Sequence, residues 1–147
     1  MFKHILIPTD GSDLSRRAIA GGVALAKAIG ARVTGLFAAP TATPIVYRHF
    51  LPVGYMTPQA HAKQIERTAE QYLSIIQRAA EKARVPCETV SVTNDFPADA
   101  ILKIAKKRRC DLIYMASHGR RGVSAVLLGS ETQKVLTHAD VPVLVHR

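Results

Sequence analysis

Short apolar runs and longer amphipathic stretches alternate along the chain. Ile5-Leu6-Ile7 is typical of a buried strand, and apolar residues then recur with helical spacing from about Leu14 to Ile29. Gly30 follows as the kind of residue that ends a helix. The same alternation continues to the end of the chain. It predicts strands over 3–8, 31–38, 87–93, 111–116 and 141–145, and helices over about 14–29, from Thr57-Pro58 to near Pro86, from Pro97 through 106–109, and over 130–138.

This order of elements predicts an α/β fold. Strands separated by helices form right-handed crossovers, which produce a parallel sheet covered on both faces. We therefore expect an open, five-stranded, mainly parallel sheet of Rossmann-like or flavodoxin-like type. A chain of 147 residues is long enough to bury one core without disulfides or metal ions, so we expect a single domain over 1–147.

Composition narrows the class of protein. The apolar runs are far shorter than the roughly 20 residues that a membrane span needs, and the first residues lack the features of an export signal. Cys87 and Cys110 are widely separated and are predicted to be reduced, partly buried thiols. We expect a cytoplasmic protein that has no membrane partner.

The net charge of +9 raises nucleic acid as a partner. However, the strongest basic run, 106–109, closes a predicted helix, where cations oppose the helix dipole on a solvated face. Trp is absent, and four Phe and four Tyr offer few surfaces for base stacking. We interpret the charge as surface charge and do not expect nucleic-acid binding.

The segment from Ala39 to Met56 is rich in Pro and Thr and is predicted to be irregular. Long loops in small domains are usually functional. We expect this one to follow the second strand and to carry a response to a ligand.

The clearest candidate chemistry follows the fourth strand. A loop of small residues leads through Gly119 to Arg120 and Arg121, and Gly129-Ser130 then opens the last helix. Backbone N–H groups at a helix N-terminus and guanidinium groups both suit a polyphosphate. Ser130 and Gln133 also match a capping box, S-x-x-Q, which needs no ligand. Both interpretations stay open here.

Asp10 follows the first strand and has two interpretations of equal weight. Ligands in parallel sheets bind beyond the carboxyl ends of the strands, where the winding direction reverses. There the Asp10 carboxylate would accept hydrogen bonds from a ribose, or hold a divalent ion that bridges phosphates. Alternatively, Asp10 forms an Asx turn that fixes the bend between strand and helix.

Several catalytic classes find no support in the sequence. The P-loop pattern and a G-x-G-x-x-G after the first strand are both missing. His118 has no nearby nucleophile with an orienting carboxylate, and the six histidines show no metal-ligand spacing. We predict no catalytic residue and no dedicated metal ligand.

Four segments together resemble the universal stress protein family, over nearly the whole chain. Nucleotide-binding members of that family carry G-x-x-G, nine residues and then G-[ST]. Here the register is Ala116-x-x-Gly119, nine residues and Gly129-Ser130. The segments are Ile5-Leu6-Ile7-Pro8-Thr9-Asp10-Gly11-Ser12, Ala116-Ser117-His118-Gly119, Leu127-Leu128-Gly129-Ser130 and Pro142-Val143-Leu144-Val145.

The resemblance implies a site that binds ATP, or AMP or ADP, with Mg²⁺ carried by the nucleotide and reached by Asp10. It implies that adenine and ribose are bordered by Pro8, Thr9 and Asp10 and lined by Met115 and Ala116. Ala38 would offer backbone groups to the adenine edge. The phosphates would be held by Gly119, Arg120, Gly129 and Ser130.

One residue departs from the family pattern. Ala116 stands where the family has the glycine beside the ribose. Its methyl group fits if the backbone angle φ is negative and crowds the nucleotide if φ is positive.

The resemblance also implies a homodimer, formed by antiparallel pairing of the last strands, Val141 to Val145. This dimer is expected to act in a stress response through a protein partner. A short apolar edge strand suits such pairing. Two alternatives stay open: an interaction module that works without nucleotide, and a slow ATP hydrolase.

Overall fold

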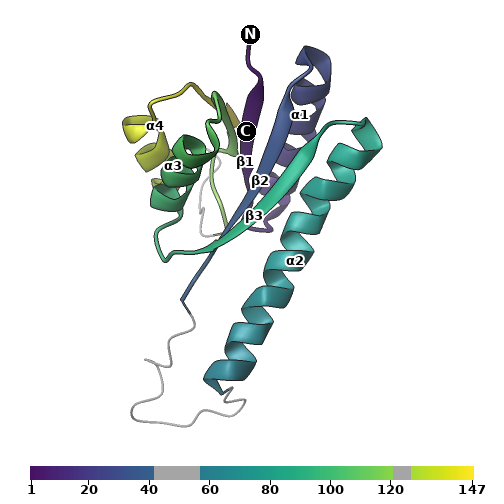
Figure 1. Cartoon of the computed structure of the whole chain (residues 1–147). Coiled ribbons are helices and arrows are strands. Elements are labelled where there is room, and N and C mark those ends of the chain that lie inside the picture. Colours follow the sequence, from purple (N-terminus) through teal and green to yellow (C-terminus); the bar gives the residue numbers. More distant parts are fainter. Residues whose placement is uncertain (42–56, 121–126) are drawn as a thin grey trace.

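Five parallel strands form the central sheet, in the order β3-β2-β1-β4-β5 (Figure 1). The computed structural model describes residues 1–41, 57–120 and 127–147. The strands are β1 (His4–Pro8), β2 (Arg32–Ala39), β3 (Cys87–Thr93), β4 (Leu112–Ala116) and β5 (Val143–His146). The helices are α1 (Asp13–Ile29), α2 (Pro58–Ala83), α3 (Pro97–Arg108) and α4 (Ser130–His138).

The sequence prediction of the fold is confirmed. In the described residues, nine elements follow one another in the predicted order, and β3 and α4 have the predicted bounds. The last strand begins at Val143 rather than at residue 141, directly after Pro142. Proline has no N–H to donate to a strand ladder, so the strand starts after it. Residues 42–56 of the predicted irregular segment lie outside the described residues.

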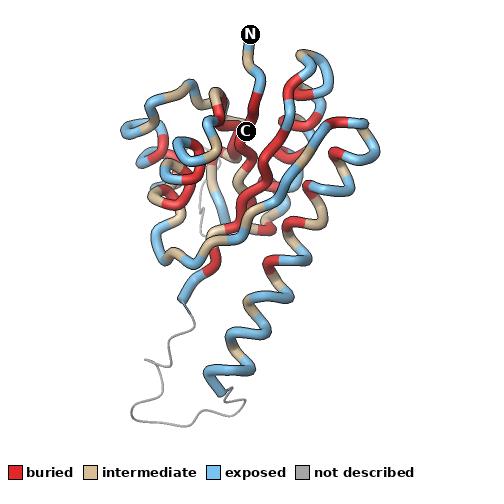
Figure 2. The backbone as a smooth tube through the Cα atoms, viewed as in Figure 1, coloured by how far each residue is buried: buried red, intermediate tan, exposed pale blue. Residues whose placement is uncertain are grey.

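The helices cover both faces of the sheet, α1 and α2 on one side and α3 and α4 on the other (Figure 1). Successive residues of a strand point to opposite faces, so β1 contributes to both cores. Ile5 and Ile7 pack under α1 and α2, whereas Leu6 packs under α3 and α4. All three are fully buried, and Figure 2 shows the buried residues concentrated along the sheet.

The predicted helix ends carry the expected caps. Ser12 Oγ accepts a hydrogen bond from Ser15 N at 3.2 Å, and Thr57 Oγ1 accepts one from Ala60 N at 3.1 Å, ahead of Pro58. Gly30 ends α1 in the left-handed conformation, with φ 70°. Among the described residues, no helix is long and apolar enough to cross a membrane.

A buried polar network holds the amino ends of the strands. His4 Nε2 lies 2.6 Å from Thr34 Oγ1, which donates its only proton to Glu88 Oε1 at 2.9 Å. The His4 ring must therefore donate from Nε2. Burial, and then the charge of Arg32, lower the pKa of His4, which keeps the ring neutral. This network lies at the opposite edge of the sheet from the carboxyl ends of the strands.

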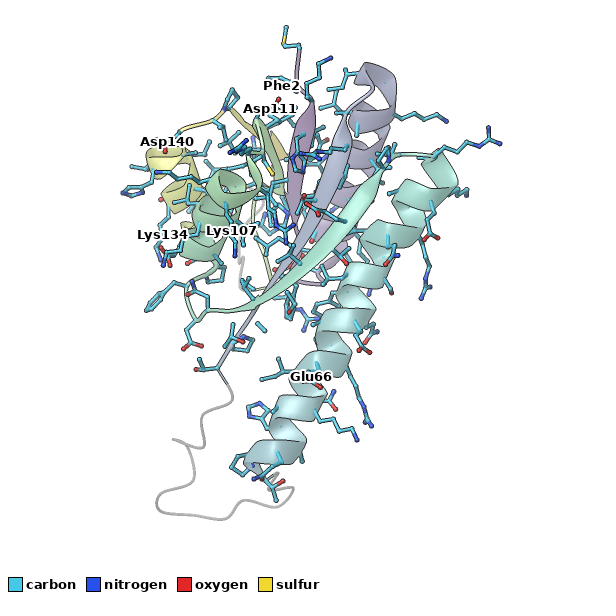
Figure 3. The ribbon with its side chains drawn as sticks, in the orientation of Figure 1. Phe2, Glu66, Lys107, Asp111, Lys134 and Asp140 are labelled. Carbon is cyan, nitrogen blue, oxygen red and sulfur yellow. The ribbon has the colours of Figure 1, made fainter. Side chains whose placement is uncertain are left out.

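Nearby, the Asp111 carboxylate accepts hydrogen bonds from the backbone N–H groups of Lys3 and His4, at 2.8 and 2.9 Å. Figure 3 shows Asp111 beside the start of the chain. Cys110 precedes it and is buried, and burial raises the pKa of this thiol to about 11. Cys110 is therefore a protonated core residue at neutral pH. Both groups serve the fold rather than a site.

Candidate functional site

The candidate site lies where the winding direction of the sheet reverses. From β1 the chain crosses through α1 to β2 on one side, and from β4 it crosses through α4 to β5 on the other. β1 and β4 are neighbours in the sheet, paired at Ile5 with Leu112. The loops after their carboxyl ends therefore meet at one point, as predicted for a ligand site in such a sheet. In Figure 1 this is the lower edge of the sheet.

The loop after β1 is fixed by its own side chains. Thr9 Oγ1 accepts hydrogen bonds from Gly11 N at 3.2 Å and from Ser15 Oγ at 2.8 Å. Asp10 Oδ1 accepts one from Ser12 N at 3.0 Å, which is the Asx turn foreseen as one interpretation of Asp10. The Asp10 carboxylate therefore stabilises this turn without any ligand.

Asp10 also joins the two loops. Its Oδ2 accepts a hydrogen bond from the backbone N of Arg120 at 2.8 Å, and its backbone O accepts one from Arg120 Nε at 3.0 Å. These residues are 110 positions apart in the sequence. The acidic residue of the first loop and the basic residue of the second are therefore already in contact.

The two glycines of the motif allow backbones to approach closely. A Cβ on Gly119 would lie 2.3 Å from Asp10 Oδ2, and a Cβ on Gly129 would lie 3.1 Å from the Cα of His118. Gly129 N also donates to Ser117 O at 2.8 Å. Neither glycine has a positive φ. Close contact, rather than an unusual turn angle, is what favours glycine at both positions.

Ala116 has room for its methyl group. It is the last residue of β4, and its φ is not positive. The methyl group packs on the core under α1 and α2, and the backbone O accepts a hydrogen bond from Thr132 Oγ1 at 3.0 Å. The backbone condition set by the sequence for an alanine here is therefore met.

The capping-box interpretation of Ser130 and Gln133 is wrong. The N-cap of α4 is Gly129, and Ser130 is the first residue of the helix. Gln133 Nε2 instead donates to Leu128 O at 3.0 Å. Within the described part of the chain the Ser130 hydroxyl has no hydrogen-bond partner, and the residue is exposed. It is available to a ligand at the helix N-terminus.

Ala38 presents its backbone to the open end of the sheet. Thr9 N donates to Leu36 O, so the polar groups of Leu36 face β1. Two residues later, those of Ala38 face the same way. β1 ends at Pro8, opposite Leu36, so the register leaves Ala38 without a partner residue in β1.

Tyr72 of α2 also lies at this site, although no sequence motif singles it out. Arg120 Nη2 donates to the Tyr72 hydroxyl, and the guanidinium carbon lies 5.2 Å from the centre of the Tyr72 ring. The ring also packs edge-on against Phe37, with 5.3 Å between centroids. A half-buried tyrosine that extends from an apolar helix face with a polar tip is the signal that points to such a role.

The remaining predicted residues differ in position. Pro8 ends β1 and is half-buried, whereas the Met115 side chain is buried in the core under α3 and α4. Only the backbone of Met115 could therefore border a ligand without repacking the core. Arg121, the second arginine of the predicted phosphate site, lies outside the described residues. In the described ranges, no three His, Cys, Asp or Glu side chains gather as a metal site.

Comparison with known proteins places this geometry in a family. The model of the universal stress protein family matches residues 1–147. A universal stress protein of Thermus aquaticus is 34% identical over 148 residues, which cover 100% of both chains. The solved structure of the protein MJ0577, a universal stress protein of Methanocaldococcus jannaschii, is 26% identical, covers 99% of this chain and 96% of its own, and has a TM-score of 0.78.

Two more distant solved structures share the fold and hold nucleotides. One is a universal stress protein in complex with cAMP, 21% identical, with a TM-score of 0.71 over 99% of this chain and 97% of its own. The other is a family protein of Arabidopsis thaliana with AMP bound, 16% identical, with a TM-score of 0.69 over 98% and 90%. By its full-length family match, the chain belongs to the universal stress protein family.

Proposed function

We propose that this chain binds an adenine nucleotide, ATP in the first instance and AMP or ADP at the same site, between the loops that follow β1 and β4. The observation that carries the proposal is the close approach of Gly119 to Asp10 and of Gly129 to His118. Both glycines lie beside the N-terminus of α4 and the exposed Ser130 hydroxyl. Helix N-termini of this kind bind phosphate through unpaired N–H groups. The nucleotides held by related structures support the choice of adenine.

In this proposal the base and sugar lie at the carboxyl ends of β1, β2 and β4. The backbone of Ala38 meets the adenine edge, since its polar groups face the open side beyond β1. Asp10 accepts from the ribose hydroxyls. Pro8, Thr9, Met115 and Ala116 border base and sugar, and Gly119, Arg120, Gly129 and Ser130 contact the phosphates. A Mg²⁺ ion would be carried by the phosphates, with Asp10 as a carboxylate within its reach.

Replacing Gly129 with valine is expected to weaken ATP binding at least about tenfold, which is about 1.4 kcal/mol of binding free energy. The valine side chain would begin 3.1 Å from the His118 backbone and would push His118 away from the N-terminus of α4. Calorimetric titration of nucleotide-free protein with Mg-ATP measures the change, and we expect a Kd in the micromolar range for the unmodified chain.

Gly30→Ala is the matched control, because a Cβ there meets nothing within 4 Å and the residue ends α1 at the far edge of the sheet. It should bind ATP like the unmodified chain. No heat with the unmodified chain, or equal affinity in Gly129→Val, would contradict the proposed site.

We also propose that the chain forms a homodimer by antiparallel pairing of β5 with its copy. β5 is the last strand of the sheet, and Leu144 is 38% exposed. Pro142 O accepts a hydrogen bond from Ile113 N of β4, and His146 O accepts one from Ser117 N, just after β4. The N–H groups of Val143 and Val145 therefore face outward. Unpaired edges of this kind favour pairing with another strand.

Val145→Pro is expected to convert the dimer to a monomer, because it removes an outward N–H and leaves the bonds to β4 in place. Sedimentation velocity measures the assembly. Val145→Thr, which keeps the N–H, should remain dimeric. A monomeric unmodified chain, or a Val145→Pro dimer of unchanged strength, would contradict pairing through this edge.

The cellular output follows from these two proposals. A cytoplasmic dimer whose loops respond to nucleotide would act in a stress response by contact with a protein partner. The titration above separates this function from an interaction module that works without nucleotide, since only the former produces heat with ATP.

A further inference from the structure

We propose that Tyr72, Arg120 and Asp10 form a clasp that closes the nucleotide site in the ligand-free chain, and that a nucleotide enters by releasing Arg120 from Tyr72. The inference rests on the proposed function. It adds Tyr72 as a positioning residue, whose contact with Arg120 lowers the affinity of the site for a nucleotide. "The clasp" denotes these three residues below.

The first observation is that the site's own loop engages the Asp10 carboxylate. Arg120 N donates to Asp10 Oδ2 at 2.8 Å, and Ser12 N donates to Oδ1 at 3.0 Å. Gly119 lies so close to Oδ2 that even a Cβ would approach it to 2.3 Å. In this arrangement Gly119 and the Arg120 N–H occupy one side of Oδ2 and keep a ribose hydroxyl from that side of the carboxylate.

The second observation is that the Arg120 side chain is tied down in the same direction. Its Nε donates to Asp10 O at 3.0 Å, its Nη2 donates to the Tyr72 hydroxyl, and its guanidinium stacks over the Tyr72 ring. The backbone and the side chain of Arg120 thus hold the described start of the loop after β4, residues 117–120, against the loop after β1. The group predicted to meet phosphate is directed to α2 instead.

Tyr72 is a firm anchor for this contact. Its ring packs edge-on against Phe37 of β2 at an interplanar angle of 88°. It also covers Gly11, where a Cβ would lie 2.3 Å from the ring carbon Cζ. Tyr72 is therefore fixed by the sheet and the first loop, whereas Arg120 is exposed and can exchange partners.

The contacts of the clasp are weak enough for a nucleotide to replace them. Hydrogen bonds and cation–π contacts of exposed side chains are weakened by water, and a phosphate offers Arg120 a stronger, charge-assisted partner. The observed affinity of a nucleotide falls by the fraction of chains that are open. Removing the Tyr72 hydroxyl should raise that fraction.

Tyr72→Phe tests the inference because it removes the hydroxyl and keeps the ring over Gly11. Mg-ATP should bind about three- to tenfold more tightly to this variant, the effect of losing one hydrogen bond from the closed state. Tyr114→Phe is the matched control: it removes a hydroxyl that contacts His146 Nδ1 at 3.1 Å and none of the three residues of the clasp. It should bind within about twofold of the unmodified chain. Unchanged or weaker binding in Tyr72→Phe would overturn the clasp, weaker binding meaning that Tyr72 holds Arg120 ready for phosphate.

A second measurement needs no nucleotide. Hydrogen exchange followed by NMR should show the Arg120 amide protected in the unmodified chain and in Tyr114→Phe, and exchanging severalfold faster in Tyr72→Phe. Equal exchange in all three proteins would overturn the clasp. If none of the three proteins binds ATP, the proposed function fails, and the exchange rates still decide whether the clasp exists.

Discussion

Gly11→Ala is expected to lower the free energy of unfolding by about 2–4 kcal/mol, the range for a substitution that both strains the backbone and overpacks a buried site. Gly11 is buried and has φ +77°, a conformation that costs a residue with a side chain about 1–2 kcal/mol. The new methyl group would also fall within 2.3 Å of the Tyr72 ring, which Phe37 holds from another side. Urea denaturation measures the loss.

Gly30→Ala is the control that separates the two causes. Gly30 has nearly the same backbone, φ +70°, but a Cβ there meets no atom within 4 Å. Only the backbone cost should remain, about 1 kcal/mol. Equal losses in the two variants would show that Tyr72 does not press on the Gly11 turn.

Helix ends such as Gly30 show which parts of the fold can be predicted from the local sequence. Gly30 follows an apolar helical repeat, and its role as the end of α1 was predictable from position. The strands were predictable for the same reason, because runs such as Ile5-Leu6-Ile7 are bounded by turn residues. α2 and α3 also end in the left-handed conformation, but on Arg84 and Arg109. Arginine carries no preference for that conformation, so these ends could be placed only by the flanking pattern.

The candidate site divides along the same line. Asp10, Gly119 and Gly129 could be singled out because each lies in a short motif next to a strand. Tyr72 could not, since its contacts with Arg120 and Gly11 join segments 48 and 61 residues away and depend on how α2 crosses the sheet. The Ser130 capping box failed for a related reason. The pattern S-x-x-Q is local, but the helix begins one residue earlier than that pattern requires, because Gly129 donates its N–H to Ser117 O and takes the N-cap position.

Asp10→Ala is expected to weaken nucleotide binding about ten- to a hundredfold. A hydrogen bond to a charged group contributes about 1.5–3 kcal/mol, and in the proposed complex the carboxylate accepts from the ribose. The same change releases Arg120 N from Oδ2, which opens the clasp and offsets part of the loss. We still expect a net loss of nucleotide affinity, because the open site lacks the carboxylate that accepts hydrogen bonds from the ribose.

Asp10→Asn separates these contributions. Its amide oxygen can still accept from Ser12 N or from a ribose hydroxyl, but it carries no charge. Its affinity for Mg-ATP should fall between those of the unmodified chain and Asp10→Ala in the same calorimetric titration. Urea denaturation of each variant establishes that the protein still folds without the Asp10 carboxylate. If Asp10→Ala binds ATP as tightly as the unmodified chain, then Asp10 serves only the turn and the contact with Arg120, and the sugar lies elsewhere.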